Sequence, residues 1–262
     1  ISLTGLAATL ADILGVGRPQ HADEPIRILY NLVKESFKSA KVDRILMYNP
    51  DAVGLWLYQK YTSDFELVLK HTQLALPLCT VMPSVTPVCF GTMYTGALPK
   101  VHGITKYEKP VIKINTLYDT ISHSKKKAAI VANRGCSMSK IFLNRKMDYY
   151  ILDSVYEINE KALELIEEDK YDFLTVYNGN YDRASHDTYP ESETALAAFK
   201  HNVSTFDVLA KAVKQHWQRH DSLIGFAPDH GNHKDEAGHG THGSDMPEDL
   251  NIMHFYGTIP KK

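Results

Sequence analysis

Residues 222–231 read Ser-Leu-Ile-Gly-Phe-Ala-Pro-Asp-His-Gly, and this stretch decides the fold prediction. Its apolar part is typical of a buried β-strand, which leads into a loop that begins with Asp229 and His230. In α/β proteins ligands bind at the carboxyl edge of the sheet, where such a loop starts. A carboxylate oxygen and an imidazole nitrogen can share one divalent cation such as zinc. The stretch therefore predicts a metal site at the end of a strand.

Further histidines follow in the same region. Residues 240–245 read Gly-Thr-His-Gly-Ser-Asp, and residues 230–254 hold five of the chain's 13 histidines. Glycines and acidic residues separate these histidines, which is typical of an irregular loop that can bring side chains to a ligand. The sequence alone leaves several of the histidines as candidate ligands.

Strands and helices alternate along the rest of the chain. This alternation predicts an α/β fold with a mainly parallel central sheet and helices on both faces. We expect a single domain over residues 1–262, with an N-terminal helical segment at about 1–40 that covers a sheet edge or forms a homo-oligomer contact. Strands are expected at 42–48, 74–81, 127–132, 149–152, 171–177, 222–228 and 250–256, and helices at 1–17, 23–39, 52–61, 115–123, 155–168 and 191–217, with a loop at 96–110.

Composition excludes several classes of protein. The chain has 44% hydrophobic residues, 23% charged residues and a net charge of −2, which gives no electrostatic argument for binding nucleic acid or an anionic membrane. No apolar run approaches the ~18 residues of a membrane span. Residues 1–17 contain Asp12 and lack a basic start, so they favour an amphipathic helix over a signal peptide. Cys79, Cys89 and Cys136 form no disulfide or metal pattern, which favours the cytoplasm.

Two polar residues stand where helices are expected to begin. Asp51 follows the first strand, where it is either a helix N-cap or a metal ligand. Thr86 precedes Pro87 at the start of a short helix. Its hydroxyl is either an N-cap or a nucleophile at a helix N-terminus, where backbone N–H groups favour phosphate. Ser84 is the nearby competitor for the nucleophile.

Asp182 and His186 follow the strand at 171–177 with i, i+4 spacing. In a helical turn this spacing puts the carboxylate and the imidazole on one face, where both can reach one cation. A solvated surface pair is the alternative. An isolated Asp-x-x-x-His pattern is weak evidence by itself.

The order of these segments resembles the alkaline phosphatase superfamily, and specifically its nucleotide pyrophosphatase/phosphodiesterase-like branch. The resemblance covers roughly residues 43–257. Its markers are Pro-Ser-Val-Thr-Pro at 83–87 with Thr-Gly at 95–96 and His-Gly-Ile at 102–104, the pair Asp182 and His186, and the two motifs at 229–231 and 241–243. By the spacing of that pattern the nucleophile falls on Thr86.

The resemblance implies a two-metal hydrolase of phosphate esters. Thr86 would attack phosphorus, and water would then hydrolyse the phospho-threonine intermediate. The Thr-His-Gly context selects His242 over His239. His102 matches a structural segment of the family and His233 is expected to face solvent, so neither is assigned to the site. The ligands implied for one metal are Asp182, His186 and His242, and those for the other are Asp51, Asp229, His230 and the Thr86 oxygen. Three imidazoles with three carboxylates favour zinc, with manganese as the alternative.

The chain departs from the family at Cys89, where the phosphodiesterase branch often has an asparagine that donates to phosphate. A thiol is a weak donor, so other groups must hold the phosphate. Asn178, Asn180 and Arg183 are candidates, although we favour a solvated loop for all three.

The implied partner is a small phosphate ester or nucleotide, either a phosphodiester, a nucleotide pyrophosphate or a phosphomonoester. A phosphomutase is an alternative, but the chain has no evident room for the cap domain that a mutase uses. A sulfatase is less favoured because neither Cys nor Ser stands at the nucleophile position. A metal-binding relative without activity would be favoured if Thr86 lay far from Asp229 and His230.

Overall fold

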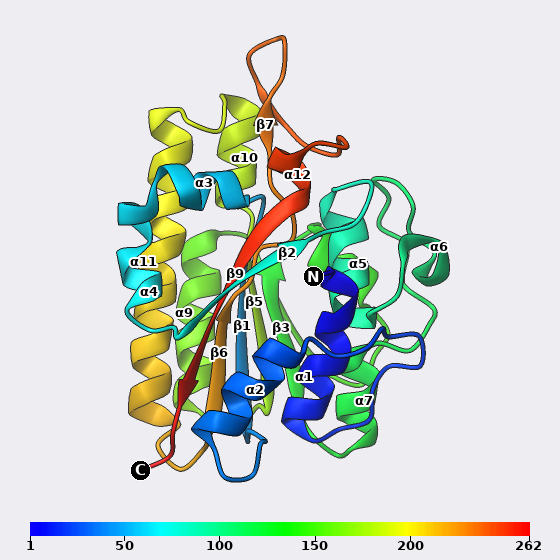
Figure 1. Ribbon diagram of the computed structural model, residues 1–262, viewed down its shortest axis with the longest axis vertical. Helices are drawn as coiled ribbons and strands as arrows, with labels where there is room; N and C mark the ends of the chain where they lie inside the picture. The colour runs from blue at the N-terminus through cyan, green and yellow to red at the C-terminus, as the bar shows by residue number, and fades with distance from the viewer.

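The computed structural model describes residues 1–262 and contains a seven-stranded sheet between two layers of helices (Figure 1). The strands are β1 (Arg44–Pro50), β2 (Leu74–Cys79), β3 (Ala128–Asn133), β4 (Asp148–Leu152), β5 (Phe173–Asn178), β6 (Ser222–Phe226) and β9 (Asn251–Ile259). They lie in the order β2-β9-β6-β1-β5-β3-β4. Strand β9 is antiparallel to both of its neighbours, whereas every other neighbouring pair is parallel. The predicted α/β class with a mainly parallel sheet is therefore confirmed.

Successive residues of the central strands point to opposite faces of the sheet. In β1, Ile45 and Met47 join one apolar core, whereas Leu46 and Tyr48 join the other. Both faces are buried, which explains why β1 and β6 are nearly continuous apolar runs and not alternating ones.

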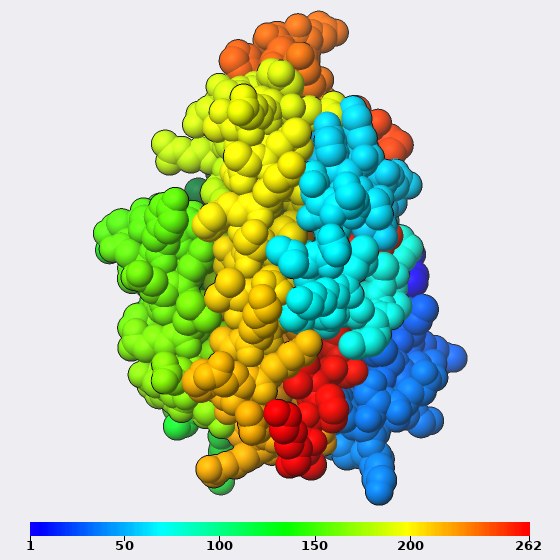
Figure 2. Space-filling model, turned by 90° about the vertical axis from the view of Figure 1, so that its left-hand side faces the viewer, coloured from blue at the N-terminus to red at the C-terminus, as the bar shows by residue number.

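Helices from the first half of the chain cover most of one face, and helices from both halves cover the other (Figure 1). The first face carries η1 (Leu3–Gly5), α1 (Leu6–Leu14), α2 (Arg27–Ser36), α5 (Thr86–Thr95), α6 (Pro99–His102), α7 (Leu117–His123) and α8 (Ser137–Ile141). The second carries α3 (Leu55–Lys60), η2 (Thr62–Phe65), α4 (Glu66–Leu69), α9 (Val155–Glu167) and α11 (Glu193–His216). The long helix α11 on the second face lies between α9, in green, and the segment that carries α4, in cyan (Figure 2).

The remaining short elements lie beyond the carboxyl ends of the parallel strands. They are α10 (Asn180–Asp187), β7 (His233–Lys234), β8 (Gly240–Thr241) and α12 (Pro247–Leu250), and the loop that carries β7 projects at the top of Figure 1. No helix of the structure has the length and apolar character that crossing a membrane requires.

Local sequence accounts for several helix ends. Ser154 and Glu157 form a reciprocal capping box at the start of α9, as Thr116 and Asp119 do for α7. Helix α1 ends at Gly15, whose φ of 72° lies in the left-handed region. The prediction of an amphipathic, exposed N-terminal helix is wrong for α1. Its residues are buried except for Asp12, because Leu, Ile and Ala occupy nearly its whole circumference.

Two predicted helices begin later than expected. The helix predicted from residue 23 begins at Arg27, after its N-cap Ile26. The backbone N–H of Ile26 donates to Thr9 Oγ1 at 2.7 Å, which holds the preceding chain in an extended conformation against α1. The helix predicted from residue 52 begins at Leu55, because Ala52 has a φ of 63° and Gly54 is extended.

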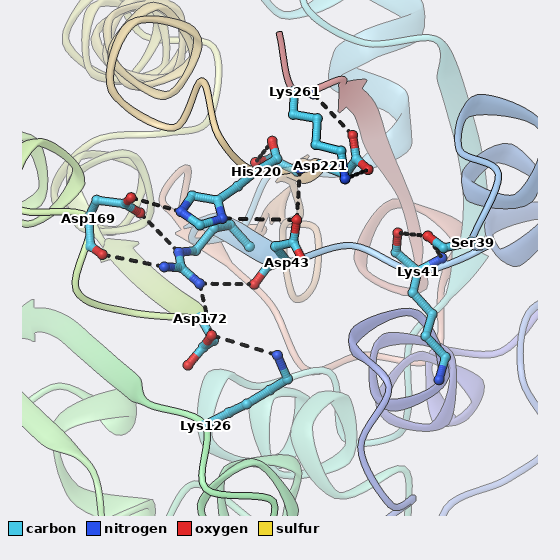
Figure 3. Close-up of polar contacts among 11 residues, drawn as sticks. Ser39, Lys41, Asp43, Lys126, Asp169, Asp172, His220, Asp221 and Lys261 are labelled. Carbon is cyan, nitrogen blue, oxygen red and sulfur yellow. Dashed lines mark hydrogen bonds and ion pairs between the residues drawn. The ribbon is translucent and has the colours of Figure 1, made fainter.

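A charged network joins the amino-terminal ends of the central strands (Figure 3). Arg44, the first residue of β1, contacts Asp169 at 3.0 Å and Asp172 at 2.8 Å. His220, just before β6, contacts Asp169 at 2.8 Å. These contacts fix the turns that enter β5 and β6 relative to β1.

The buried histidine of β9 makes stability depend on pH. His254 Nε2 donates to the Pro228 carbonyl at 2.7 Å, and its Nδ1 lies 2.9 Å from Tyr256 Oη. Burial lowers the pKa of His254 to about 4. Between the unfolded pKa of ~6.5 and this value, only the unfolded chain takes up the proton. The free energy of unfolding must therefore fall with decreasing pH, by up to about 1.4 kcal/mol per pH unit from this residue.

We expect His254→Gln to make that pH dependence shallower in urea unfolding of metal-free protein between pH 7 and 5. His21→Gln, at an exposed position, is the control and should leave the slope unchanged. Equal slopes for His254→Gln and the parent chain would contradict the prediction.

Candidate metal centre

Three central strands deliver polar residues to one edge of the sheet. Strand β1 lies between β5 and β6, and all three run parallel. Asp51 follows β1 directly, and Asp229 follows β6 after two residues. Asp182 lies on α10, the helix that follows β5. Parallel strands end at the same edge, so the three carboxylates meet there.

The first group consists of Asp51, Asp229 and His230, all fully buried. His230 Nε2 lies 3.3 Å from Asp51 Oδ1 and 3.4 Å from Asp229 Oδ2. Asp51 is not a helix N-cap, because Gly54 caps α3. The capping alternative for Asp51 is therefore wrong.

The second group consists of Asp182, His186 and His242. Asp182 and His186 lie one turn apart on α10, with His186 Nε2 3.4 Å from Asp182 Oδ1. His242 Nε2 lies 3.5 Å from the same carboxylate oxygen. The helical spacing therefore puts both side chains on one face, and the loop after β8 adds the third.

Backbone carbonyls fix the orientation of all three imidazoles. The Nδ1 atoms lie 2.9 Å from the Gly231 carbonyl for His230, 2.8 Å from the Gly240 carbonyl for His186, and 2.9 Å from the Ser84 carbonyl for His242. A proton on Nδ1 leaves the Nε2 lone pair facing the carboxylates. Histidines that bind metals in proteins are usually held by such a bond from the other nitrogen.

The surroundings of the buried carboxylate oxygens indicate whether cations fit this centre. Asp51 Oδ1, Asp182 Oδ1 and Asp229 Oδ2 are buried and have no hydrogen-bond donor. Burial raises the pKa of Asp51 well above its usual range, and the neighbouring charge of Asp182 adds to this rise. Burial and the charge of Asp51 do the same to the pKa of Asp229. Oxygen and nitrogen donors in this combination suit divalent ions, so the residues fit two cations.

The two groups are adjacent. The rings of His230 and His242 stack with centroids 4.1 Å apart, and those of His186 and His242 lie 5.0 Å apart. Burial lowers the pKa of His230 to about 3 and also lowers the pKa of His242. Both imidazoles are therefore neutral near pH 7, as a metal ligand must be.

Thr86 is the first residue of α5 and is not its N-cap, which is Val85. Its Oγ1 lies 3.3 Å from His230 Nε2 and 3.5 Å from Asp51 Oδ2. Ser84 contributes differently, because its hydroxyl lies 3.5 Å from the Ser244 carbonyl while its own carbonyl holds His242. Thr86, and not Ser84, is thus the hydroxyl beside the first group.

The structure brings together every residue that the sequence assigned to the centre, although their roles as ligands and nucleophile stay predictions. The histidines left out of the site lie elsewhere. His102 contacts Thr92 Oγ1 at 3.1 Å, His233 contacts Asp249 at 2.7 Å, and His239 is exposed.

The candidate phosphate-holding residues do not reach the centre through their polar atoms. Asn178 donates to Tyr48 Oη at 2.8 Å, and Asn180 donates to the Ala198 carbonyl at 3.2 Å. The prediction of a solvated loop is also wrong for Asn178 and Asn180, because Asn178 ends β5 and Asn180 begins α10. Arg183 is exposed on α10 and lies 3.8 Å from Asp187. Cys89 is buried within α5, with its Sγ 3.9 Å from the Val81 carbonyl.

Tyr177 is a site residue that the sequence analysis missed. Its buried hydroxyl donates to Asp51 Oδ2. The signal was available, since alternation along β5 puts Tyr177 on the same face as Phe173, toward α5.

Gly231 explains the third position of the Asp-His-Gly motif. A Cβ at this residue would lie 1.9 Å from the Glu248 carbonyl oxygen and 2.9 Å from Gly54 Cα. Both obstacles are backbone, so the loop could accept a side chain only by moving His230.

We expect Gly231→Ala to lower the free energy of unfolding by roughly 1–3 kcal/mol, the usual cost of overpacking, and to reduce bound metal. Urea unfolding and elemental analysis measure the two effects. Gly17→Ala is the matched control, because no atom lies within 4 Å of its added Cβ. Unchanged stability and metal content in Gly231→Ala would contradict this account.

Metal binding to the second group should release a proton. The adjacent Asp182 carboxylate, 3.4 Å from its Nε2, raises the pKa of His186 to about 9 in the metal-free protein. A cation must displace the proton of His186, so affinity should rise with pH by up to about tenfold per unit below pH 9.

Calorimetric titration of zinc at pH 7 in buffers of different ionisation enthalpy measures this proton. His186→Gln should reduce the number of protons released, whereas exposed His239→Gln should not. The same heat in every buffer for the parent chain would refute the assignment.

Comparison with known proteins finds likeness in structure and not in sequence. No protein-family model matches this chain, and no curated protein sequence matches it. Murine ectonucleotide pyrophosphatase/phosphodiesterase 5 in complex with AMP matches with a TM-score of 0.57 and 16% identity, over 74% of this chain and 59% of that one. Phosphonoacetate hydrolase from Sinorhizobium meliloti 1021 in complex with phosphonoformate matches with a TM-score of 0.53 and 11% identity, over 72% and 56%.

A 2-O GAG sulfatase also matches, with a TM-score of 0.57 and 10% identity, over 83% of this chain and 64% of the sulfatase. The chain thus spans between 56% and 64% of the length of these three structures. All three are members of one superfamily, which the resemblance had named. Identities this low show the architecture alone: the chain has the fold of the alkaline phosphatase superfamily.

Proposed function

We propose that this chain is a metal-dependent hydrolase of phosphate esters that works through a phospho-threonine intermediate at Thr86. The observation that carries the proposal is the position of one hydroxyl. Thr86 Oγ1 lies 3.3 Å from His230 Nε2 and 3.5 Å from Asp51 Oδ2, beside three carboxylates and three imidazoles. This proximity argues against a metal-binding relative without activity, which would not need a hydroxyl there.

The residues divide into two ligand groups. Asp51, Asp229, His230 and the Thr86 oxygen would hold one divalent cation, and Asp182, His186 and His242 the other. Imidazole nitrogens together with carboxylates favour zinc, with manganese as the alternative. When bound, two such ions supply positive charge for the attacking and leaving oxygens of an in-line displacement.

Thr86 is suited to attack at phosphorus by its place on α5. The helix has ten residues, and the positive end of its dipole favours an anionic phosphate at the same end as the hydroxyl. A bond forms between Thr86 Oγ1 and phosphorus as the bond from phosphorus to the leaving oxygen breaks. Water then attacks the phosphorus, which frees the Thr86 hydroxyl and releases the phosphate product.

Among related reactions, hydrolysis of phosphate esters is favoured over hydrolysis of sulfate esters. Sulfatases of this superfamily use a nucleophile made from Cys or Ser, whereas Thr86 occupies that position here. The substrate is then a small phosphomonoester, phosphodiester or nucleotide pyrophosphate. A phosphomutase would return the phosphate of Thr86 to its substrate and not to water.

Replacement of the nucleophile tests the proposal. We expect Thr86→Ala to lower kcat by on the order of 10³-fold or more while bound metal persists, because the six side-chain ligands remain. Turnover is measured with p-nitrophenyl phosphate, bis-p-nitrophenyl phosphate and nucleotides in the presence of zinc or manganese, and metal content by elemental analysis. Full activity in Thr86→Ala would overturn the nucleophile assignment.

Two further variants separate the nucleophile from its neighbours. Ser84→Ala keeps the carbonyl that holds His242 and should keep turnover within a few-fold. Asp229→Asn should lose metal and activity together, since it removes a buried ligand charge. Unchanged metal content in Asp229→Asn would count against its role as a ligand.

A further inference from the structure

We propose a second ligand site in this chain: a basic cavity that binds a small molecule carrying several phosphate groups. The cavity has a volume of about 510 Å³ and lies at the amino-terminal ends of β3, β4 and β5. Asp148 is its only acidic residue. Its basic residues are five lysines and one arginine, namely Lys125, Lys126, Lys127, Lys146, Lys170 and Arg145.

One wall of the cavity is a run of three lysines on a fixed backbone. The N–H of Lys127 donates to Asp172 Oδ2 at 2.7 Å, and its carbonyl accepts from the Asp172 N–H at 2.9 Å. The N–H of Lys126 donates to the Ile121 carbonyl at 3.1 Å, and Lys125 has a left-handed φ of 59° that completes the turn. The lysine Cα positions are therefore set by the fold.

The opposite wall is fixed by Arg145. Its guanidinium donates to Asp119 at 3.1 Å and to the Ile112 carbonyl at 2.8 Å, and its side chain is only 6% exposed. Arg145 is therefore a structural residue whose charge is already paired. Because Arg145 is held in this way, the backbone of the neighbouring Lys146 is also fixed at the rim of the cavity.

Several of the cavity's cations lack an anionic partner. Lys126 lies 3.7 Å from Asp172 (Figure 3). Lys170 lies 3.4 Å from Asp148. No ion pair is formed by Lys125, Lys127 or Lys146, which are all exposed. Three like charges around one concave space attract a multivalent anion, and they do so in a chain whose net charge is −2.

The cavity is separate from the metal centre. Tyr171, two residues before β5, lines it, whereas Tyr177 near the end of β5 contacts Asp51 of the centre. The four residue steps from Phe173 to Tyr177 along β5 alone span about 13 Å at ~3.3 Å per residue. An anion in the cavity would therefore touch neither the predicted metal ligands nor Thr86.

The surroundings favour a small ligand over a polymer. A volume of about 510 Å³ is in the range of small-molecule sites. Glu168, the C-cap of α9, is exposed and lies two residues before Lys170 in the chain. An extended polyanion or a charged membrane surface would meet this carboxylate and its exposed neighbour Glu167. A compact phosphate chain would not.

The test is calorimetric titration of tripolyphosphate into the full chain after its metals have been removed with EDTA and the EDTA dialysed away. ATP in parallel shows whether the ligand is a bare phosphate chain or a nucleotide that carries one. We expect Lys125→Ala/Lys127→Ala to raise Kd at least about tenfold, since each charged hydrogen bond contributes ~1.5 kcal/mol or more. The parent affinity should fall as salt rises.

Matched controls separate this site from net charge and from catalysis. Lys34→Ala/Lys38→Ala removes two exposed lysines on or just after α2 and should change Kd less than twofold. Thr86→Ala should leave Kd unchanged, so binding stands or falls independently of the proposed hydrolysis. Failure of both phosphate compounds to bind at millimolar concentration, or equal Kd values for the cavity variant and the parent, would overturn the proposal. So would tighter binding of a single-stranded oligonucleotide or a phosphatidylserine vesicle through the same lysines.

Discussion

Three carboxylates gathered at one edge of the sheet, two of them fully buried, impose the constraint on which the centre depends. Asp51 and Asp229 are fully buried, and Asp182 lies beside them with an unpaired oxygen. Burial of like charges is costly unless cations or hydrogen bonds offset it, as the raised pKa values of Asp51 and Asp229 record. Hydrogen bonds supply little here, and the neutral imidazoles of His230 and His242 supply no charge. The centre is consequently a place that cations stabilise.

The backbone of the fold positions the side chains of the centre. Adjacent parallel strands bring Asp51 and Asp229 to one edge, and carbonyls from three separate segments turn each imidazole toward the carboxylates. The carbonyl of Ser84 holds His242 two residues before Thr86, so the segment that carries the hydroxyl also orients a ligand of the second group. Small movements of that segment would therefore disturb both predicted metals together.

Local sequence predicted much of this arrangement. Apolar runs revealed the central strands, and the i, i+4 spacing put Asp182 and His186 on one face of α10. What the sequence could not reveal depends on contacts between distant segments. The late start of α2 follows from a bond between Ile26 and Thr9, and the contact of Tyr177 with Asp51 requires the register of β1 against β5. The apolar composition of α1 did not by itself predict burial on all sides, because that burial depends on which elements pack around the helix.

Strand β9 has a consequence for synthesis of the protein. It lies inside the sheet between β2 and β6, yet it is the last of the seven strands of this sheet to leave the ribosome. Until it emerges, β6 has an unpaired edge and β2 has no partner strand, although both are complete. Unpaired edges recruit strands from other chains. The nascent polypeptide is therefore most prone to aggregation in the interval between the synthesis of β6 and that of β9, which is when a chaperone would protect it most.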